Sequence, residues 1–197
     1  MLGVPRGYGI LAEGNEMAKS VAVAQQGKPV YQDEIVTRAS ARRVLAAGRL
    51  IIGWVFLWAF IDKLFGLGFS TGAERAWIRG GTPAQGYIGG IEGPFAGPLQ
   101  SLFGNSFGDW LFMIGLAGLG VALLLGIGLK VAAVAGTLLL ALMYLSQFPA
   151  AVGGTNPITT SHWVEAALVV LAAVTLAGDT WGLGRWWAGK VGNGWLR

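Results

Sequence analysis

Four long blocks of apolar residues constrain this chain more than any other feature of its sequence. They span residues 44–64, 110–129, 131–148 and 163–177, and the last is the shortest. An α-helix rises 1.5 Å per residue, so about 20 apolar residues cross the roughly 30 Å hydrocarbon core of a bilayer. The composition agrees, because 54% of the 197 residues are hydrophobic and 12% are charged, unlike an average soluble domain. We therefore expect an integral membrane protein.

The same blocks predict α-helices rather than strands. A backbone amide in lipid finds no water, so a spanning segment must satisfy its own hydrogen bonds. The short alternating strands of a membrane β-barrel are absent from the sequence. A short turn at Lys130 makes the second and third blocks antiparallel neighbours. The expected fold is all-α: a polytopic bundle of four transmembrane helices within residues 44–187, with a long extracytoplasmic loop between helices 1 and 2.

Small residues recur every four positions along the second and third blocks. They are Gly118, Ala122 and Gly126, followed by Ala133, Thr137 and Ala141. Such stripes allow helix backbones to approach closely. We expect them to hold the bundle together.

The positions of Lys and Arg predict how the helices are oriented. Basic residues are concentrated before the first block, at the turn between the second and third, and after the fourth. They are Arg6, Lys19, Lys28, Arg38, Arg42, Arg43, Lys130, Arg185, Lys190 and Arg197. By the positive-inside rule both termini are cytoplasmic, and the loop after the first helix lies outside. We expect a multi-pass protein of the bacterial cytoplasmic (inner) membrane.

Two segments flank this membrane domain. Residues 1–43 are expected to form a flexible cytoplasmic tail, and residues 188–197 a cytoplasmic C-terminal tail. The first forty residues lack the apolar core of a cleavable signal peptide, and the purine-rich codons implied by Glu13 and Gly14 suggest a translation start at Met17. The net charge of +4 follows from the topology, so the expected partner is the lipid bilayer and not nucleic acid.

The sequence contains no cysteine and one histidine. It therefore has no structural disulfide, thiolate metal site or iron–sulfur cluster, and bis-histidine haem ligation is excluded. We expect no metal and no covalently bound cofactor. Electrons that pass through such a chain must be held by an exchangeable carrier or by a partner.

Five ionisable residues are predicted to meet at the outer rim of the bundle. Asp62 and Lys63 close the first helix, Asp109 begins the second, and His162 and Glu165 begin the fourth. His162 and Glu165 are three positions apart and share one helix face. Because ionisable groups at membrane depth usually pair or line a polar cavity, His162, Glu165 and Asp62 are the candidate catalytic residues.

Cations at the same rim suggest how a substrate is bound. Lys63 lies at the end of the first helix, and the loop that follows contains Arg75 and Arg79. An anion that arrives from outside needs such charged donors. These three cations and the aromatic Trp58 are the candidate substrate-binding residues.

Simpler interpretations stand beside these assignments. Asp62 and Lys63 are adjacent, so they point about 100° apart and can mark a helix end in the headgroup layer. Asp109 can cap the amides of its own helix, and His162 can be a polar residue at the interface. Arg49, near the start of the first helix, is expected to snorkel to cytoplasmic phosphates.

Two segments resemble a known family. Residues 48–66, "GRLIIGWVFLWAFIDKLFG", are similar to the first-helix pattern of the DoxX/DoxD-like membrane proteins, with an early Arg, a glycine, an aromatic run and a closing Lys-Leu. Residues 156–187, "NPITTSHWVEAALVVLAAVTLAGDTWGLGRWW", resemble the segment with which DoxD-type members enter and leave their last helix. The resemblance covers residues 42–187 and leaves out the N-terminal tail.

The resemblance implies a choice of functions. DoxD-type members form the membrane subunit of thiosulfate:quinone oxidoreductase, which oxidises thiosulfate to tetrathionate and passes electrons to quinone. By analogy, quinone is an exchangeable substrate that enters from lipid near Trp54, Trp58 and Phe112, and His162 or Glu165 transfers protons. The open alternative is a noncatalytic accessory subunit of a respiratory-chain or other membrane redox complex, with redox subunits as partners. A transporter ranks last, because inverted repeats and proline-broken helices are lacking.

Overall fold

The structure is a computed structural model that describes residues 28–148, 156 and 158–197. Within these residues the chain is helical and contains no strand, so the all-α prediction is confirmed for the described part. The proposed start at Met17 lies outside the described residues. The elements are α2 (Gln32–Ile35), α3 (Ala39–Phe65), η1 (Ala73–Arg75), η2 (Trp77–Arg79), α4 (Pro83–Ile88), α5 (Ala96–Phe103), α6 (Ser106–Leu125), α7 (Leu129–Ser146), α8 (Ser161–Val174), η3 (Ala177–Asp179) and α9 (Gly184–Val191).

Three helices, α3, α6 and α7, are long and apolar enough to cross a membrane. At their ends, a capping side chain satisfies terminal backbone groups, or a glycine in the left-handed conformation ends the helix. The Asn105 side chain accepts a hydrogen bond from the Gly108 amide at the start of α6, while α3 and α6 end at Gly66 and Gly126 in the left-handed conformation. The fourth apolar helix, α8, has 14 residues.

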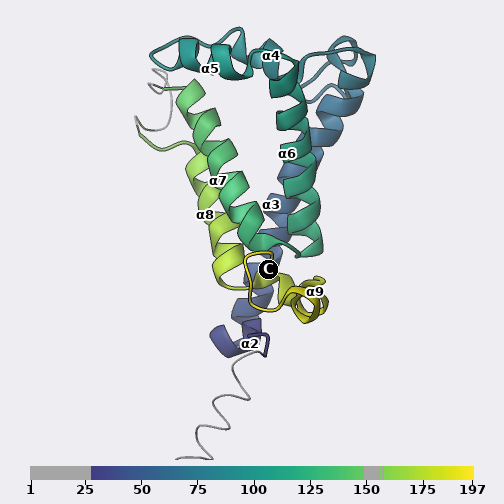
Figure 1. Ribbon diagram of the computed structural model, residues 1–197, viewed down its shortest axis with the longest axis vertical. Helices are drawn as coiled ribbons and strands as arrows, with labels where there is room; N and C mark the ends of the chain where they lie inside the picture. Colours follow the sequence, from purple (N-terminus) through teal and green to yellow (C-terminus); the bar gives the residue numbers. More distant parts are fainter. Residues whose placement is uncertain (1–27, 149–155, 157) are drawn as a thin grey trace, which may run out of the picture.

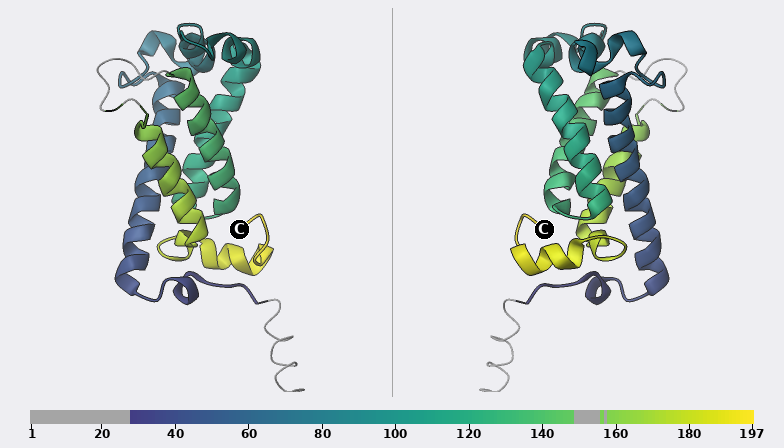
Figure 2. Two further views of the ribbon diagram at one scale, coloured as in Figure 1. Left: turned by 90° about the vertical axis from the view of Figure 1, so that its left-hand side faces the viewer. Right: turned by 90° about the vertical axis from the view of Figure 1, so that its right-hand side faces the viewer.

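The four helices α3, α6, α7 and α8 run along the long axis of the molecule in two closely packed pairs (Figure 1). α3 packs mainly against α6, and α7 packs mainly against α8. α6 and α7 are joined by a turn at one end and diverge toward the other (Figure 1). The short elements between α3 and α6 lie across the wide end as a roof, and α2 and α9 lie near the opposite end (Figure 2). The turn between α6 and α7 falls at residues 126–128, and Lys130 already belongs to α7.

Glycines bring α3 and α6 into backbone contact, but they are not the glycines expected from the sequence. A Cβ on Gly120 would lie 2.7 Å from the backbone nitrogen of Leu57, and one on Gly53 would lie 3.0 Å from the Leu123 Cβ. A Cβ on Gly118 would meet no described atom within 4 Å. Gly118 is two positions from Gly120, about 200° around the helix, so the α3 contact uses a different face of α6 from the one that carries Gly118. Gly126, from the same stripe, packs instead against Gly178.

Arg49 is buried inside the bundle, so the expectation that it snorkels to phosphates is wrong. The residue is 1% exposed. Its guanidinium donates hydrogen bonds to the carbonyls of two chain segments that end near it. The acceptors are Leu123 and Leu124 at the end of α6, and Ala177, Thr180 and Trp181 in and after η3. Arg49 thus satisfies carbonyls that a helix end leaves without partners.

Residues 28–43 and 188–197, the described parts of the two predicted tails, contain helix and contact each other. Gln32 is buried, and its backbone amide donates a hydrogen bond to the Asp179 carboxylate over 2.9 Å. The Arg197 side chain forms a buried ion pair with Asp179 at 2.9 Å. Asn193 accepts a hydrogen bond from the Val30 amide at 2.8 Å. The two ends of the described chain therefore pack together beneath the bundle.

Candidate functional site

A cavity of about 940 Å³ lies at the wide end of the bundle beneath the roof. Much of its lining is apolar and comes from side chains of the long helices. They are Val55, Phe56, Ala59, Leu111, Phe112, Leu116, Leu139, Leu140, Leu142 and Met143. Its upper wall contains cations, hydroxyls and the His162–Glu165 pair. Such a mixture of apolar lining and a few convergent polar groups is typical of a small-molecule site.

Asp62 and Lys63 serve different parts of this region. Asp62 is 1% exposed, and its carboxylate accepts backbone hydrogen bonds from Phe69, Ser70 and Thr71 at 3.2, 2.8 and 3.0 Å. It also accepts one from the Ser70 hydroxyl at 2.6 Å. The Lys63 ammonium lines the cavity, donates to the Ser70 hydroxyl over 3.1 Å and lies 6.0 Å from the Phe112 ring centroid. Asp62 therefore shapes the loop, and Lys63 presents a positive charge to the cavity.

Asp109 fastens the roof to the bundle. It is 4% exposed and accepts hydrogen bonds from the Ala84 amide at 2.7 Å, the Gln85 amide at 3.0 Å and the Gln85 side chain. These amides begin α4, so Asp109 caps α4 and not its own helix, which Asn105 caps. The expectation that Asp109 caps its own helix is wrong.

Arg75 and Arg79 lie at the exposed rim of the cavity. Arg75 pairs with Glu74 at 3.3 Å, and Arg79 donates to the Ala73 carbonyl over 3.3 Å. A hydrogen bond from its own backbone amide, and then one from Arg75, lower the pKa of the Glu74 carboxyl below its ordinary value. Glu74 thus stays ionised beside Arg75 and offsets part of its charge. Lys63 and Arg79 are then the cations at the cavity that form no ion pair within the described residues.

The other side of the cavity carries a chain of polar side chains from three helices. His162 Nδ1 lies 3.7 Å from Glu165 Oε2, and His162 Nε2 lies 3.4 Å from the Gln147 amide nitrogen. The same amide nitrogen donates to the Tyr87 hydroxyl over 3.3 Å. Tyr87 and Ser146 hydroxyls are 2.8 Å apart, and Ser146 donates to the Met143 carbonyl over 2.6 Å. The chain links α8 and the end of α7 to the roof helix α4.

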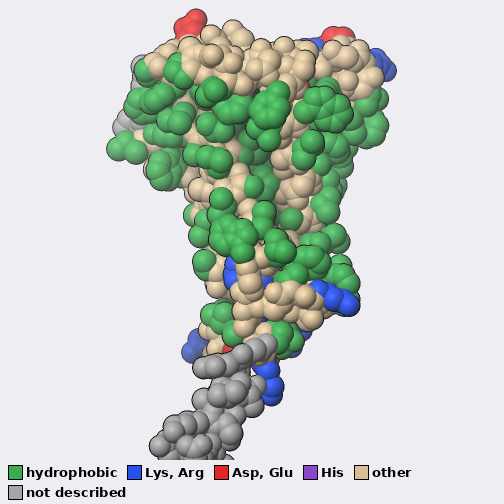
Figure 3. All heavy atoms as spheres, in the orientation of Figure 1, with side chains coloured by type: hydrophobic (Ala, Val, Ile, Leu, Met, Phe, Trp, Pro, Cys, Tyr) green, Lys and Arg blue, Asp and Glu red, His purple; other side chains and the backbone are tan. Residues whose placement is uncertain are grey.

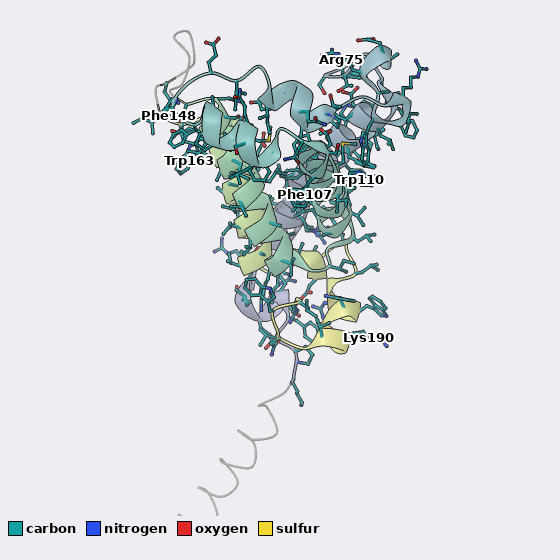
Figure 4. All side chains as sticks on the ribbon, turned by 45° about the horizontal axis from the view of Figure 1, so that its top comes forward. Arg75, Phe107, Trp110, Phe148, Trp163 and Lys190 are labelled. Carbon is teal, nitrogen blue, oxygen red and sulfur yellow. The ribbon has the colours of Figure 1, made fainter. Side chains whose placement is uncertain are left out.

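Five of the seven predicted site residues line the cavity, and two do not. Lys63, Arg75, Arg79, His162 and Glu165 line it. The cations and the His162–Glu165 pair come from different parts of the wall: Figure 4 shows Arg75 on one side of the roof and Trp163, the neighbour of His162, on the other.

The two predicted residues outside the lining are Asp62 and Trp58. The Asp62 carboxylate is directed into the loop that follows α3. Trp58 packs against the exposed Trp54 and Phe69, with ring centroids 5.7 and 5.1 Å away. Neither residue is brought to the His162–Glu165 pair.

Sequence reasoning missed Tyr87, Ser146 and Gln147, which connect His162 to the roof. Ser146 and Gln147 fall at the end of the third apolar block, where a polar residue is ordinary. Tyr87 falls in a glycine-rich loop that predicts no defined partner. The only sequence signal was their closeness to the predicted outer rim.

Comparison with family models, with curated proteins and with solved structures finds no match for this chain. Within the part of the chain that the structure describes, no cluster of three or more His, Cys, Asp or Glu side chains is arranged to hold a metal ion.

Proposed function

We propose that this chain is a DoxX/DoxD-like membrane protein that acts as the membrane subunit of a thiosulfate:quinone oxidoreductase. The observation that carries the proposal is the division of the cavity wall: Lys63 on one side, the His162–Glu165 pair on another, and apolar side chains below. A cation suits a small dianion, a histidine–carboxylate pair suits proton transfer, and the apolar part suits a quinone ring and its chain.

The proposal includes four membrane crossings in the bacterial inner membrane, with both termini cytoplasmic. α8 is apolar and packs against α7 and α3, which supports a fourth crossing. Its helical rise is about 21 Å, so flanking residues or local bilayer thinning must cover the remaining thickness. Arg185 and Lys190 at the α9 end favour the cytoplasm, and the roof then forms the long extracytoplasmic loop.

The proposed reaction balances between the two substrates. Two thiosulfate ions give up two electrons and join through a new S–S bond as tetrathionate. The quinone takes up both electrons and two protons to become the quinol. Lys63 and Arg79 attract the anions, and the His162–Glu165 pair holds a proton at the cavity wall for the reduced ring.

Thiosulfate-dependent reduction of decylubiquinone by the purified protein tests this proposal. We expect Lys63→Ala to raise the KM for thiosulfate about tenfold, because a charge-assisted contact is lost. Glu165→Gln should lower kcat about 100-fold, because general acid–base catalysis is lost. Lys190→Ala removes the same charge at the opposite end and should leave both constants unchanged. Wild-type kinetics in both cavity variants would contradict the proposal.

A noncatalytic accessory subunit of a membrane redox complex is the second candidate. One observation favours it: Trp54, Trp58 and Phe69 form a partly exposed aromatic surface outside the cavity. An accessory subunit should co-purify in fixed ratio with haem-containing partners after mild detergent extraction. The purified chain alone should then show no thiosulfate-dependent quinone reduction.

A further inference from the structure

His162 is the single histidine of the chain, and its two ring nitrogens face different partners. Nδ1 is directed toward the Glu165 carboxylate, 3.7 Å away, and Nε2 toward the Gln147 amide nitrogen, 3.4 Å away. The His162 side chain is 12% exposed. A largely buried imidazole with two unlike neighbours has a preferred tautomer, because the neutral ring has one donor and one acceptor nitrogen.

The neighbours select the tautomer. A deprotonated Nδ1 would direct its lone pair toward the acceptor oxygens of the Glu165 carboxylate, so the proton belongs on Nδ1. Nε2 is then an acceptor and requires a donor. The Gln147 amide nitrogen is that donor, and it also donates to the Tyr87 oxygen over 3.3 Å.

The hydroxyls beyond Gln147 fix its orientation. The Ser146 hydroxyl gives its hydrogen to the Met143 carbonyl at 2.6 Å, so it accepts from Tyr87 at 2.8 Å. The Tyr87 hydrogen is therefore directed toward Ser146, which leaves a Tyr87 lone pair toward Gln147. From the Met143 carbonyl to His162 Nε2, each hydrogen bond thus has one donor and one acceptor. The Nδ1 hydrogen lies on the side of the Glu165 carboxylate, 3.7 Å away, and forms no hydrogen bond in this structure.

We propose that Gln147 and Tyr87 are positioning residues that fix neutral His162 with its proton on Nδ1, directed at Glu165. The pair then holds a transferable proton at the cavity wall, and the roof helix α4, which carries Tyr87, takes part in orienting it. The use of this proton to protonate reduced quinone rests on the proposed function; the tautomer does not. Lys63, Glu74, Arg75 and Arg79 are the other charged residues lining the cavity.

Nitrogen NMR of protein labelled only at histidine tests the tautomer directly. One histidine gives one pair of ring-nitrogen signals, which need no assignment among residues. We expect the wild type to show a protonated Nδ1 and an unprotonated Nε2 at a pH where the ring is neutral. Gln147→Leu should shift the population toward the Nε2-protonated form, and Tyr87→Phe should do so in part, because Gln147 then loses one of its partners.

Gln100→Leu is the matched control for this experiment. Gln100 belongs to α5 and donates to roof carbonyls of Ile88 and Ile91, away from His162. The substitution makes the same chemical change and should leave the His162 signals unchanged. A wild-type ring protonated on Nε2, or unchanged signals in a folded Gln147→Leu variant, would overturn the inference.

Kinetics separate this inference from the proposed function. With thiosulfate and decylubiquinone, Gln147→Leu should lower kcat about tenfold and leave the KM for thiosulfate unchanged, since Lys63 is intact. If the wild type lacks the activity while the Gln147→Leu tautomer shifts, the proposed function fails and the positioning role is supported. If activity is present and the tautomer does not respond, the positioning role fails alone.

Discussion

Arg49, Asp62 and Asp109 are buried charges whose hydrogen-bond partners are mainly backbone groups. Arg49 donates to carbonyls at the end of α6 and the start of η3, and Asp62 and Asp109 accept from amides where a loop and α4 begin. A charged group that meets several oriented peptide dipoles needs no opposite ion to offset the loss of water. These residues hold the ends of elements together, and the cavity charges are separate from them.

Replacement of Arg49 tests how much this arrangement stabilises the fold. Arg49→Ala leaves buried carbonyls of α6 and η3 without donors, and each such group costs about 1–3 kcal/mol. We expect the free energy of unfolding to fall by about 3 kcal/mol or more, seen as a lower thermal midpoint in detergent. Arg43→Ala, an exposed position on the same helix, should change it little. Equal midpoints for the two variants would contradict this role.

The roof helix α4 has only six residues, so it depends on contacts with other elements. An isolated helix of this length is unstable in water. Pro83 begins it, the Asp109 carboxylate satisfies its first amides, and Tyr87 bonds Ser146 on α7. The roof is thereby held on both sides of the cavity, by α6 and by α7.

Loss of the Asp109 cap should open the roof locally without unfolding the bundle. In Asp109→Ala, residues 83–91 lose their cap, which is typically worth about 1 kcal/mol. We expect faster amide hydrogen exchange in these residues and unchanged exchange in α7. Glu92→Ala removes an exposed roof carboxylate and serves as the control. Unchanged exchange in residues 83–91 would show that the other roof contacts hold α4 without Asp109.

The sequence predicts the helices and site residues that depend on a local pattern of residues. Apolar blocks and nearby caps define α3, α6 and α7 closely, and five of the seven predicted site residues line the cavity. The sequence does not predict that Asp109 caps amides about 25 positions away, or that Tyr87 meets Ser146 across 59 positions. Which glycine faces α3 also depends on helix rotation, and this is why Gly120 was missed.

The whole molecule has two chemically different ends. The flanks of the long helices carry hydrophobic side chains, and basic side chains are visible at the α9 end (Figure 3). The cavity lies at the opposite end, beneath the roof. A protein with this layout in a bilayer would open its polar cavity wall toward one compartment only.

The absence of cysteine allows a direct test of orientation. Single substitutions Glu92→Cys in the roof and Lys190→Cys in α9 introduce one thiol each into exposed positions. We expect a membrane-impermeant maleimide to label Glu92→Cys in intact spheroplasts, and Lys190→Cys only after permeabilisation. The reverse pattern would mean that the roof and the cavity face the cytoplasm.

The contact between the two ends of the described chain has a consequence for the order of synthesis. Val30 and Lys28 form hydrogen bonds with Asn193, which lies 163 and 165 positions later in the chain. The Gln32 backbone amide donates one to Asp179, 147 positions later. A ribosome makes the first group of residues long before the second, at about 5–20 residues per second. These contacts of Lys28, Val30 and Gln32 can therefore form only after all of the long helices are made. The lower end of the protein is completed last, after the cavity walls have already been synthesised.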